Sequence, residues 1–160
     1  MLSAYITHPD CSRHDMGAGH PECPERLSAI HDRLLIAGLL DYMAPYDAPL
    51  ATRTQLARAH TMSYVRALIA EAPAEGLRFV DPDTLMNPHT VQAALRAAGA
   101  AVLATDLVLA GKAPTAFCNV RPPGHHATRD AAMGFCFFNN VAVGIRHALQ
   151  VHSLQRVALI

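Results

Sequence analysis

Arg121–Asn140, with the sequence RPPGHHATRDAAMGFCFFNN, lies between two segments whose structures can be predicted from their residues. The segment before it, Ala116–Val120, is apolar and typical of a buried strand. The segment that closes it, Asn139–Leu149, is typical of a helix. A strand, a loop and a helix in this order form the repeating unit of a parallel α/β sheet. Functional loops of such sheets gather at the carboxyl ends of the strands, so we expect this loop there.

The remaining segments continue the alternation of strands and helices. A turn is expected at the end of Phe79–Thr84, where the sequence reads DPDT. The other predicted elements are, in order, Leu2–Thr7 (strand), Pro24–Gly38 (helix), Tyr42–Pro49 (extended), Thr54–Ala59 and Met62–Glu71 (helices), Pro88–Ala110 (buried helix) and Val157–Ile160 (buried strand). We therefore predict an α/β fold, a parallel sheet flanked by helices, in one domain over residues 1–160.

The composition excludes several classes of protein. About half of the 160 residues are apolar, 16% are charged, and the formal net charge is zero. This balance gives no electrostatic footprint for nucleic acid or a membrane surface. Gly99 and Asp106 interrupt the longest apolar runs, which fall short of the roughly 20 residues of a membrane span. The N-terminus has no signal-peptide pattern, so we expect a cytoplasmic protein; homo-oligomerisation stays open.

Four cysteines, Cys11, Cys23, Cys118 and Cys136, are widely spaced and form no CxxC pair. This spacing argues against a zinc knuckle and against a disulfide scaffold. We expect reduced thiols, most of them structural.

The adjacent His125 and His126 are the first candidate site. Neighbouring residues of an extended loop point to opposite sides, so the pair should not clamp one metal ion from a single face. Two imidazoles near one site can instead hold different protonation states, as a neutral base and a charged helper. Pro122, Pro123 and Gly124 suit a loop that holds side chains in place. Exposed loop histidines without a role are the alternative, but the residues on both sides favour function.

Gly134 and Phe135 are the second candidate. A glycine directly before a phenylalanine can expose the ring to a ligand, so Phe135 could line a channel. The run of apolar residues around it is equally consistent with a hydrophobic core.

These motifs together resemble the histone deacetylase superfamily, in particular its bacterial class II-like, acetylpolyamine and acetoin-utilisation branches. RPPGHHA and MGFCFFNN carry most of the resemblance. Residues 19–27, GHPECPERL, look like the family's N-terminal HPExPxR signature, and the pairs His60-Thr61, Tyr64-Val65 and Asp83-Thr84 also fit. The resemblance spans almost the whole chain and implies the N-terminal part of an arginase/deacetylase-like fold, with a catalytic zinc at the strand ends.

The resemblance also implies roles for single residues. His126 matches the general base and acid, and His125 the electrostatic helper beside it. Phe135, with Gly134, matches the wall of a narrow acyl-lysine tunnel. Arg26 matches the arginine of an internal pocket for the acetate product. Asp81 and Asp83 lie where the family has a rim residue that grips the substrate backbone; either could fill that place.

One part of the family pattern does not occur in this sequence. The strand that resembles residues 156–160 continues in the family into Asp-x-Asp-x-His, which supplies zinc ligands, and a later Asp and Tyr complete that site. His8, His14 and His20 do not replace these ligands, and we interpret them as capping or packing residues. We therefore expect the ligands to lie beyond Ile160 and the chain alone to hold no catalytic zinc and to be inactive.

The sequence favours the N-terminal half of a zinc-dependent amidohydrolase that removes acetyl or similar groups from lysine side chains or polyamines. The alternative is a non-catalytic binding or assembly module built on the same fold. A third possibility, a truncated product, is chemically the same as the first. A stand-alone module would protect its last strand with charge or proline, and Val157–Ile160 carries neither, which favours truncation.

Overall fold

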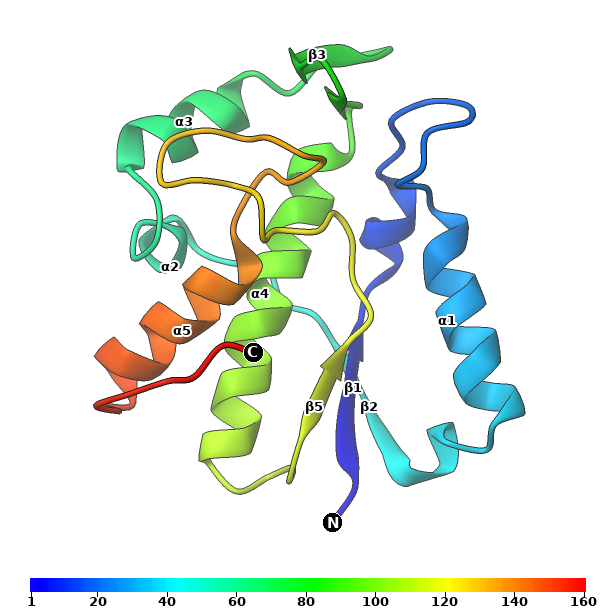
Figure 1. The fold of residues 1–160 in the computed structure, drawn as a ribbon, viewed down its shortest axis with the longest axis vertical. Helices are drawn as coiled ribbons and strands as arrows, with labels where there is room; N and C mark the ends of the chain where they lie inside the picture. Colours follow the sequence, from blue (N-terminus) through cyan, green and yellow to red (C-terminus); the bar gives the residue numbers. More distant parts are fainter.

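The computed structural model describes all of residues 1–160 and has a three-stranded parallel sheet at its centre (Figure 1). The strands are β1 (Ser3–Thr7), β2 (Met43–Asp47) and β5 (Ala116–Cys118), in the order β2-β1-β5. Ser3 pairs with Met43 on one side, and Ala4 pairs with Ala116 on the other. The predicted α/β fold with a parallel sheet is therefore confirmed.

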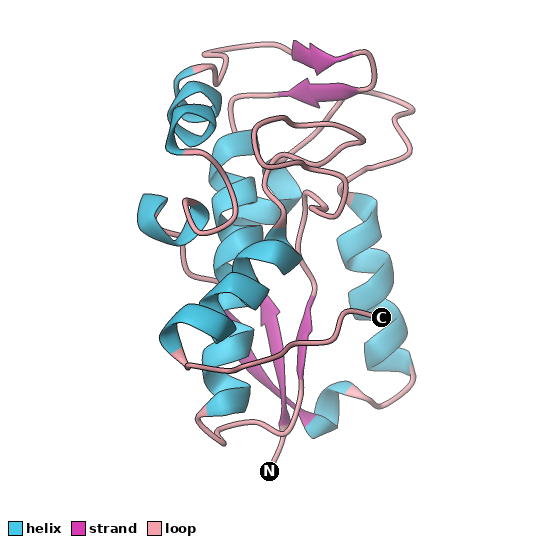
Figure 2. Ribbon diagram, turned by 60° about the vertical axis from the view of Figure 1, so that its left-hand side comes forward, coloured by secondary structure: helices cyan, strands magenta, loops and turns pink.

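Helices cover both sides of this sheet (Figures 1 and 2). α4 (Thr90–Leu109) packs on β1 and β5 and makes its largest contact with α5 (Asn140–Val151), while α1 (Glu25–Ile36) lies on the opposite side. The shorter helices are η1 (Pro9–Arg13), η2 (Leu40–Tyr42), α2 (Arg53–Leu56) and α3 (Met62–Ala70). Each predicted helix is thus present, with ends shifted by a few residues.

α4 is the helix around which the core is built. Its small side chains allow close packing, and the closest approach is at Gly99, where a Cβ would lie 1.9 Å from the Pro49 carbonyl oxygen. The Ala51 amide nearby donates to the carbonyl of Leu95 at 2.9 Å. By length and composition alone α4 could cross a membrane, but half of its most apolar window is buried inside the protein, as in a core helix.

Local sequence signals explain where several helices begin and end. Thr61 is extended and accepts a hydrogen bond from the Tyr64 amide, which confirms it as the N-cap of α3. Asn139 caps α5 in the same way through the Ala142 amide. Gly38, with φ of +67°, follows α1 at the predicted stop.

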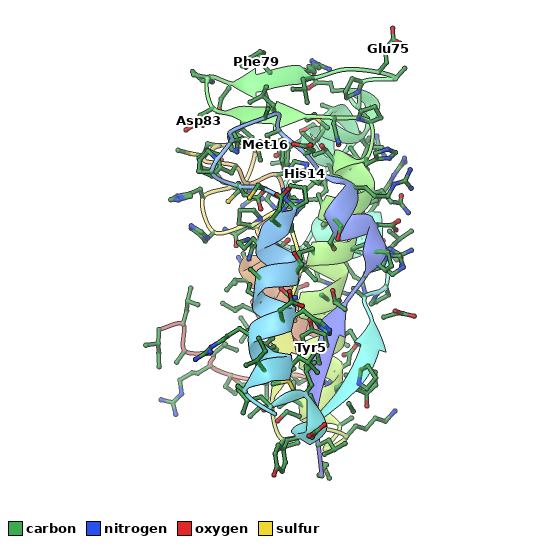
Figure 3. The ribbon with its side chains drawn as sticks, turned by 90° about the vertical axis from the view of Figure 1, so that its right-hand side faces the viewer. Tyr5, His14, Met16, Glu75, Phe79 and Asp83 are labelled. Carbon is green, nitrogen blue, oxygen red and sulfur yellow. The ribbon has the colours of Figure 1, made fainter.

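β3 (Arg78–Asp81) and β4 (Thr84–Met86) form an antiparallel hairpin at the end of the molecule near the carboxyl ends of the sheet strands (Figures 1 and 3). Only the turn between them was predicted. The sequence signal is weak because β3 is four residues long, largely exposed, and irregular in its pairing between Phe79 and Asp81.

The predicted strand Val157–Ile160 is wrong. Residues 154–160 form an irregular, exposed segment, which we call the tail. A strand needs a partner for its backbone groups, and no sheet strand pairs with the tail. The strand predicted at Ala116–Val120 is shorter, ends at Cys118, and is half-buried rather than buried because one of its edges is free.

Candidate active site

The loop of residues 119–139 leaves the carboxyl end of β5 and returns to the start of α5 (Figure 1, yellow to orange). We call this segment the site loop. Its position confirms the expectation that the His-His motif lies at the carboxyl end of a parallel strand. Gly124 fixes the two ends against each other, since a Cβ there would lie 2.5 Å from the Asn140 nitrogen and from the Phe138 carbonyl oxygen.

His125 and His126 lie side by side at the tip of a tight turn. The Ala127 amide donates to the Gly124 carbonyl at 3.2 Å, so the two histidines are the central residues of a β-turn. Their ring centroids are 4.2 Å apart with planes at 52°, and both side chains are exposed. The expectation that they point to opposite sides is wrong because the backbone turns there and is not extended.

Gly134 and Phe135 lie directly against this pair. A Cβ on Gly134 would meet the His126 ring at 2.8 Å, so glycine lets the imidazole approach the backbone. Phe135 has a φ of +69°, a left-handed conformation that side-chain-bearing residues rarely adopt. The surrounding structure must impose this conformation, and such residues concentrate at functional sites. The predicted neighbourhood of histidines and phenylalanine is therefore present.

The hairpin and the N-terminal loop hold Phe135 from the other side. Its amide donates to the buried Thr84 hydroxyl at 2.9 Å, and its ring contacts the edge of His20, with centroids 4.7 Å apart. His20 Nε2 lies 3.1 Å from the carbonyl oxygen of Asp83. Phe135 is thus half-buried between His126 and the Asp81–Asp83 turn, as a wall residue would be.

Asp81 and Asp83 differ in how the turn uses them. Asp81 Oδ1 accepts from the Asp83 amide at 3.0 Å. Burial alone would raise the pKa of Asp81, but hydrogen bonds from Asp83 and Thr84 outweigh it and lower that pKa. The side chain of Asp83 is exposed, at the outer end of the hairpin (Figure 3). Of the two carboxylates, Asp83 is therefore better placed to meet a molecule from outside.

A buried ion pair anchors the start of the site loop. Arg121 is fully buried and forms a bidentate pair with Glu22, with Nε–Oε1 and Nη2–Oε2 distances of 2.7 and 2.6 Å. Its remaining nitrogen donates to the carbonyls of Cys11 and His14. The guanidinium therefore ties the site loop to the N-terminal loop. The sequence reasoning assigned no role to Arg121, although a charge beside Pro-Pro-Gly was the available signal.

One of the three N-terminal histidines, His14, also borders this anchor, with its Nε2 3.6 Å from Glu22 Oε2. His14 is buried, lies 2.9 Å from the Thr90 hydroxyl through Nδ1, and packs on Phe137. Burial, with the nearby Arg121 charge, lowers the pKa of His14 to about 3, so the ring is neutral. His8 caps η1 by accepting from the Asp10 amide. The capping and packing roles predicted for these histidines are confirmed.

Arg26 lies beneath the loop, at the end of β5. Its Nη2 donates to the Val120 carbonyl at 3.0 Å and is 3.7 Å from Glu22 Oε1, with 41% of the side chain exposed.

His60 and Tyr64 support the far end of the site loop. The buried His60 accepts from the Asn139 amide through Nε2 at 2.9 Å, and burial lowers its pKa. The Tyr64 hydroxyl donates to the Phe137 carbonyl at 2.6 Å. Both residues therefore fix the GFCFFNN segment, which explains why they accompany it in the sequence pattern.

The residues around the histidine pair do not make a metal site. Two exposed imidazoles offer at most two nitrogens, and Cys136 is fully buried with a pKa raised by burial. One cluster of three metal-binding side chains does occur, formed by Asp106, His147 and His152 on α4 and α5. It lies at the opposite end of α5 from the site loop. No sequence pattern indicates this cluster, because Asp106 is 41 positions away from His147.

This fold, with paired histidines on the loop that follows the parallel edge strand β5, is shared with a known family of proteins. The chain belongs to the histone deacetylase family, whose profile, described as "Histone deacetylase domain", matches residues 20–160. It is 39% identical over 143 residues to a histone deacetylase-like amidohydrolase of Pseudomonas aeruginosa, covering 89% of this chain and 37% of that protein.

Other relatives come from distant organisms. The chain is 36% identical over its whole length to 25% of the human polyamine deacetylase HDAC10, and 32% identical to 44% of a probable deacetylase of Archaeoglobus fulgidus. The solved structure of the HDA15 HD domain superposes with a TM-score of 0.85 at 32% identity, covering 94% of this chain and 44% of that one. This chain thus spans less than half the length of each of these four proteins.

Proposed function

We propose that this chain supplies the histidine pair and one tunnel wall of a zinc-dependent deacetylase that acts on acetylated lysine side chains or acetylated polyamines. The observation that carries the proposal is the contact of His126 with Gly134, beside Phe135, at the carboxyl end of β5. Family membership supports the reaction class, because several relatives are named deacetylases. In this proposal the zinc ligands lie outside residues 1–160, and the chain by itself is inactive.

Each residue of the site has a defined task in the proposal. His126 takes the proton of the attacking water and returns it to the leaving amine. The same imidazole thus acts first as a general base and then as a general acid. His125, with its ring 4.2 Å away, stabilises the charge that His126 acquires or loses. Phe135, with Gly134, holds the aliphatic part of the substrate, Asp83 binds it at the rim, and Arg26 receives the acetate product.

A chimera tests the proposal. Residues 1–160 replace the matching segment of the Pseudomonas aeruginosa relative, and hydrolysis of an acetyl-lysine peptide and of an acetylated polyamine is compared with that of the 160-residue chain. We expect activity in the chimera only. His126→Ala in the chimera should lower turnover by about 10²–10⁴-fold. Arg129→Ala, an exposed change in the same loop, should leave it unchanged.

Three results would contradict the proposal. A folded chimera without activity would show that these residues do not support the reaction. Activity of the 160-residue chain equal to that of the chimera would show that it needs nothing from outside. Full activity of His126→Ala would move the role of the base to another residue, first to His125.

The alternative function, a non-catalytic binding or assembly module, is favoured by one observation. Large apolar side chains are exposed on β5, α5 and the tail: Phe117, Val141, Val151, Val157, Leu159 and Ile160. Val141 lines one surface hollow with Val157 and another with Leu159, and adjoining exposed apolar surface marks interaction sites. Sedimentation equilibrium of the chain, with and without the C-terminal remainder of the Pseudomonas relative, measures whether this surface associates; a strictly monomeric chain that ignores the added segment would exclude the alternative.

A further inference from the structure

Three side chains converge where the C-terminal parts of α4 and α5 meet. Asp106 Oδ1 lies 2.7 Å from His147 Nε2 and 2.6 Å from His152 Nε2. The three donor atoms all lie within 4.8 Å of one another. Both nitrogens therefore contact the same carboxylate oxygen, and the two histidine rings are 5.3 Å apart with their planes at 74°. We call these three residues the helix clasp.

We propose that the helix clasp is a metal site that binds Zn²⁺. Two imidazole nitrogens and one carboxylate oxygen are a ligand set that Zn²⁺ prefers, with solvent as the fourth ligand. Ligand atoms of a tetrahedral zinc site lie about 3.3 Å apart, because each bond is about 2.0–2.1 Å long. The donors of the clasp are therefore close enough that small side-chain rotations would admit the ion.

Burial in the helix clasp is graded in a way that suits an ion. The His147 side chain is 6% exposed, His152 27% and Asp106 45%. The buried imidazole is held by the packing of α5 on α4, while the exposed carboxylate leaves a path for the ion and a position for water. Such an ion would join the two helices at the point where α5 ends.

Arg58 sets one requirement for binding. Its Nη1 lies 2.6 Å from Nδ1 of His147, and a guanidinium can only donate, so Nδ1 accepts and Nε2 carries the proton. A metal at Nε2 needs the opposite tautomer, with the proton on Nδ1. Arg58, which is long and partly exposed, must therefore swing away when the ion binds. Arg58 and zinc thus compete for His147, which makes a specific prediction about this arginine.

The site is separate from the proposed catalytic site. α5 is 12 residues long, which corresponds to about 18 Å of helix, with the site loop at its start and the helix clasp at its end. No residue of the clasp has a part in the proposed deacetylation. Zinc binding by the 160-residue chain is therefore independent of whether the chain contributes to catalysis.

The test is a zinc titration of the purified 160-residue chain after chelator treatment, by calorimetry and by the absorption of Co²⁺ as a substitute ion. We expect one equivalent to bind. Asp106→Asn, which keeps a hydrogen-bond acceptor, and His152→Ala, at the helix end, should each weaken binding by about tenfold or more. Arg58→Met should strengthen binding, because it frees the Nδ1 atom of His147 for protonation.

The histidine pair provides the matched control. The double variant His125→Ala/His126→Ala should bind zinc as the unchanged chain does. Circular dichroism checks that each variant is folded, and His152→Ala alone decides the question if Asp106→Asn is not. Absence of stoichiometric binding would overturn the proposal, as would binding that survives both clasp variants or is lost in the double variant.

Discussion

Two short apolar segments, β5 and the tail, each follow one of the two helices packed together on the sheet, yet they have different structures. β5 (Ala116–Cys118) pairs with β1 along its length, and the Asn119 amide donates to the Ile6 carbonyl just beyond it. The tail, residues 154–160, has one backbone hydrogen bond to the rest of the chain, from Leu154 to Ala148. The difference shows that an apolar composition permits a strand, and that a strand forms only where a neighbouring strand offers backbone hydrogen bonds.

The same contrast extends to what each segment supports. The site loop that follows β5 is fixed by a buried ion pair, by the close approach at Gly124 and by hydrogen bonds with α1, β4 and α3. The side chains of the tail are exposed, and that of Ile160 is fully exposed to solvent. We therefore expect changes around the site loop to affect stability strongly, and changes in the tail to affect it little.

Among changes around the site loop, Arg121→Met should lower the free energy of unfolding the most. It leaves the Glu22 carboxylate buried without its cation and deprives two carbonyls of their donor. Removal of one partner from a buried pair costs about 3–5 kcal/mol of unfolding free energy. Urea unfolding followed by circular dichroism measures it. Arg78→Met, which removes an exposed pair with Glu71, should cost no more than about 1 kcal/mol. Equal losses in the two variants would contradict the role of Arg121.

Acid should have the second-largest effect, by lowering the free energy of unfolding through His14, which packs beneath the site loop. The pKa of His14 is about 3 in the folded chain against 6.5 for the free side chain. Below pH 6.5 the unfolded chain therefore binds a proton that the folded chain rejects, so this contribution is complete above that pH and decreases as the pH falls toward 3. The loss is on the order of a few kcal/mol. Unfolding free energy measured from pH 7.5 to 4 should fall more steeply for the natural chain than for His14→Gln; parallel curves would refute this.

Gly124→Ala should have an intermediate effect. The added Cβ meets backbone atoms of Phe138 and Asn140 at 2.5 Å, which cannot rotate away, so we expect a loss of about 1–3 kcal/mol. Gly144→Ala in α5 is the matched control, since its Cβ would approach the nearest atom at 3.3 Å, and alanine favours the helix. Denaturant midpoints of the two variants should differ clearly. If they agree, the site loop is more adaptable than its contacts indicate.

Changes in the tail should have the smallest effect. Val157→Ser and Leu159→Ser remove exposed side chains, and we expect the unfolding free energy to change by no more than about 0.5 kcal/mol. Ile6→Val, a smaller chemical change at a fully buried position of β1, should cost about 0.5–1.5 kcal/mol. Thermal melting of the three variants orders them. A tail variant that destabilises more than Ile6→Val would mean that the tail packs in solution.

The sequence predicted the features that depend on local signals. Helix ends were predicted from single residues: Thr61 and Asn139 at the start of a helix and Gly38 after the end of one. The alternation of strands and helices was sufficient to predict the parallel sheet. The family motif placed the histidine pair and Phe135 at the correct end of a strand. These successes rest on short-range patterns and on one motif.

What the sequence did not predict depends on the arrangement in space. Arg121 finds Glu22 across 99 positions, and Asp106 meets His147 across 41, so neither contact leaves a local pattern. The side-by-side histidines depend on a turn that the residues alone did not distinguish from an extended loop. The strand predicted in the tail failed because pairing is a property of the neighbours.

The hydrogen bond from Tyr64 to the Phe137 carbonyl has an optical consequence. The protein contains no tryptophan and four tyrosines, so tyrosine emission is not masked by an indole. Burial raises the pKa of Tyr64, so its phenol should resist ionisation in an alkaline titration. A ligand that shifts Phe137 would alter the surroundings of the Tyr64 phenol, and the intrinsic ultraviolet fluorescence of the chain would report it without a label.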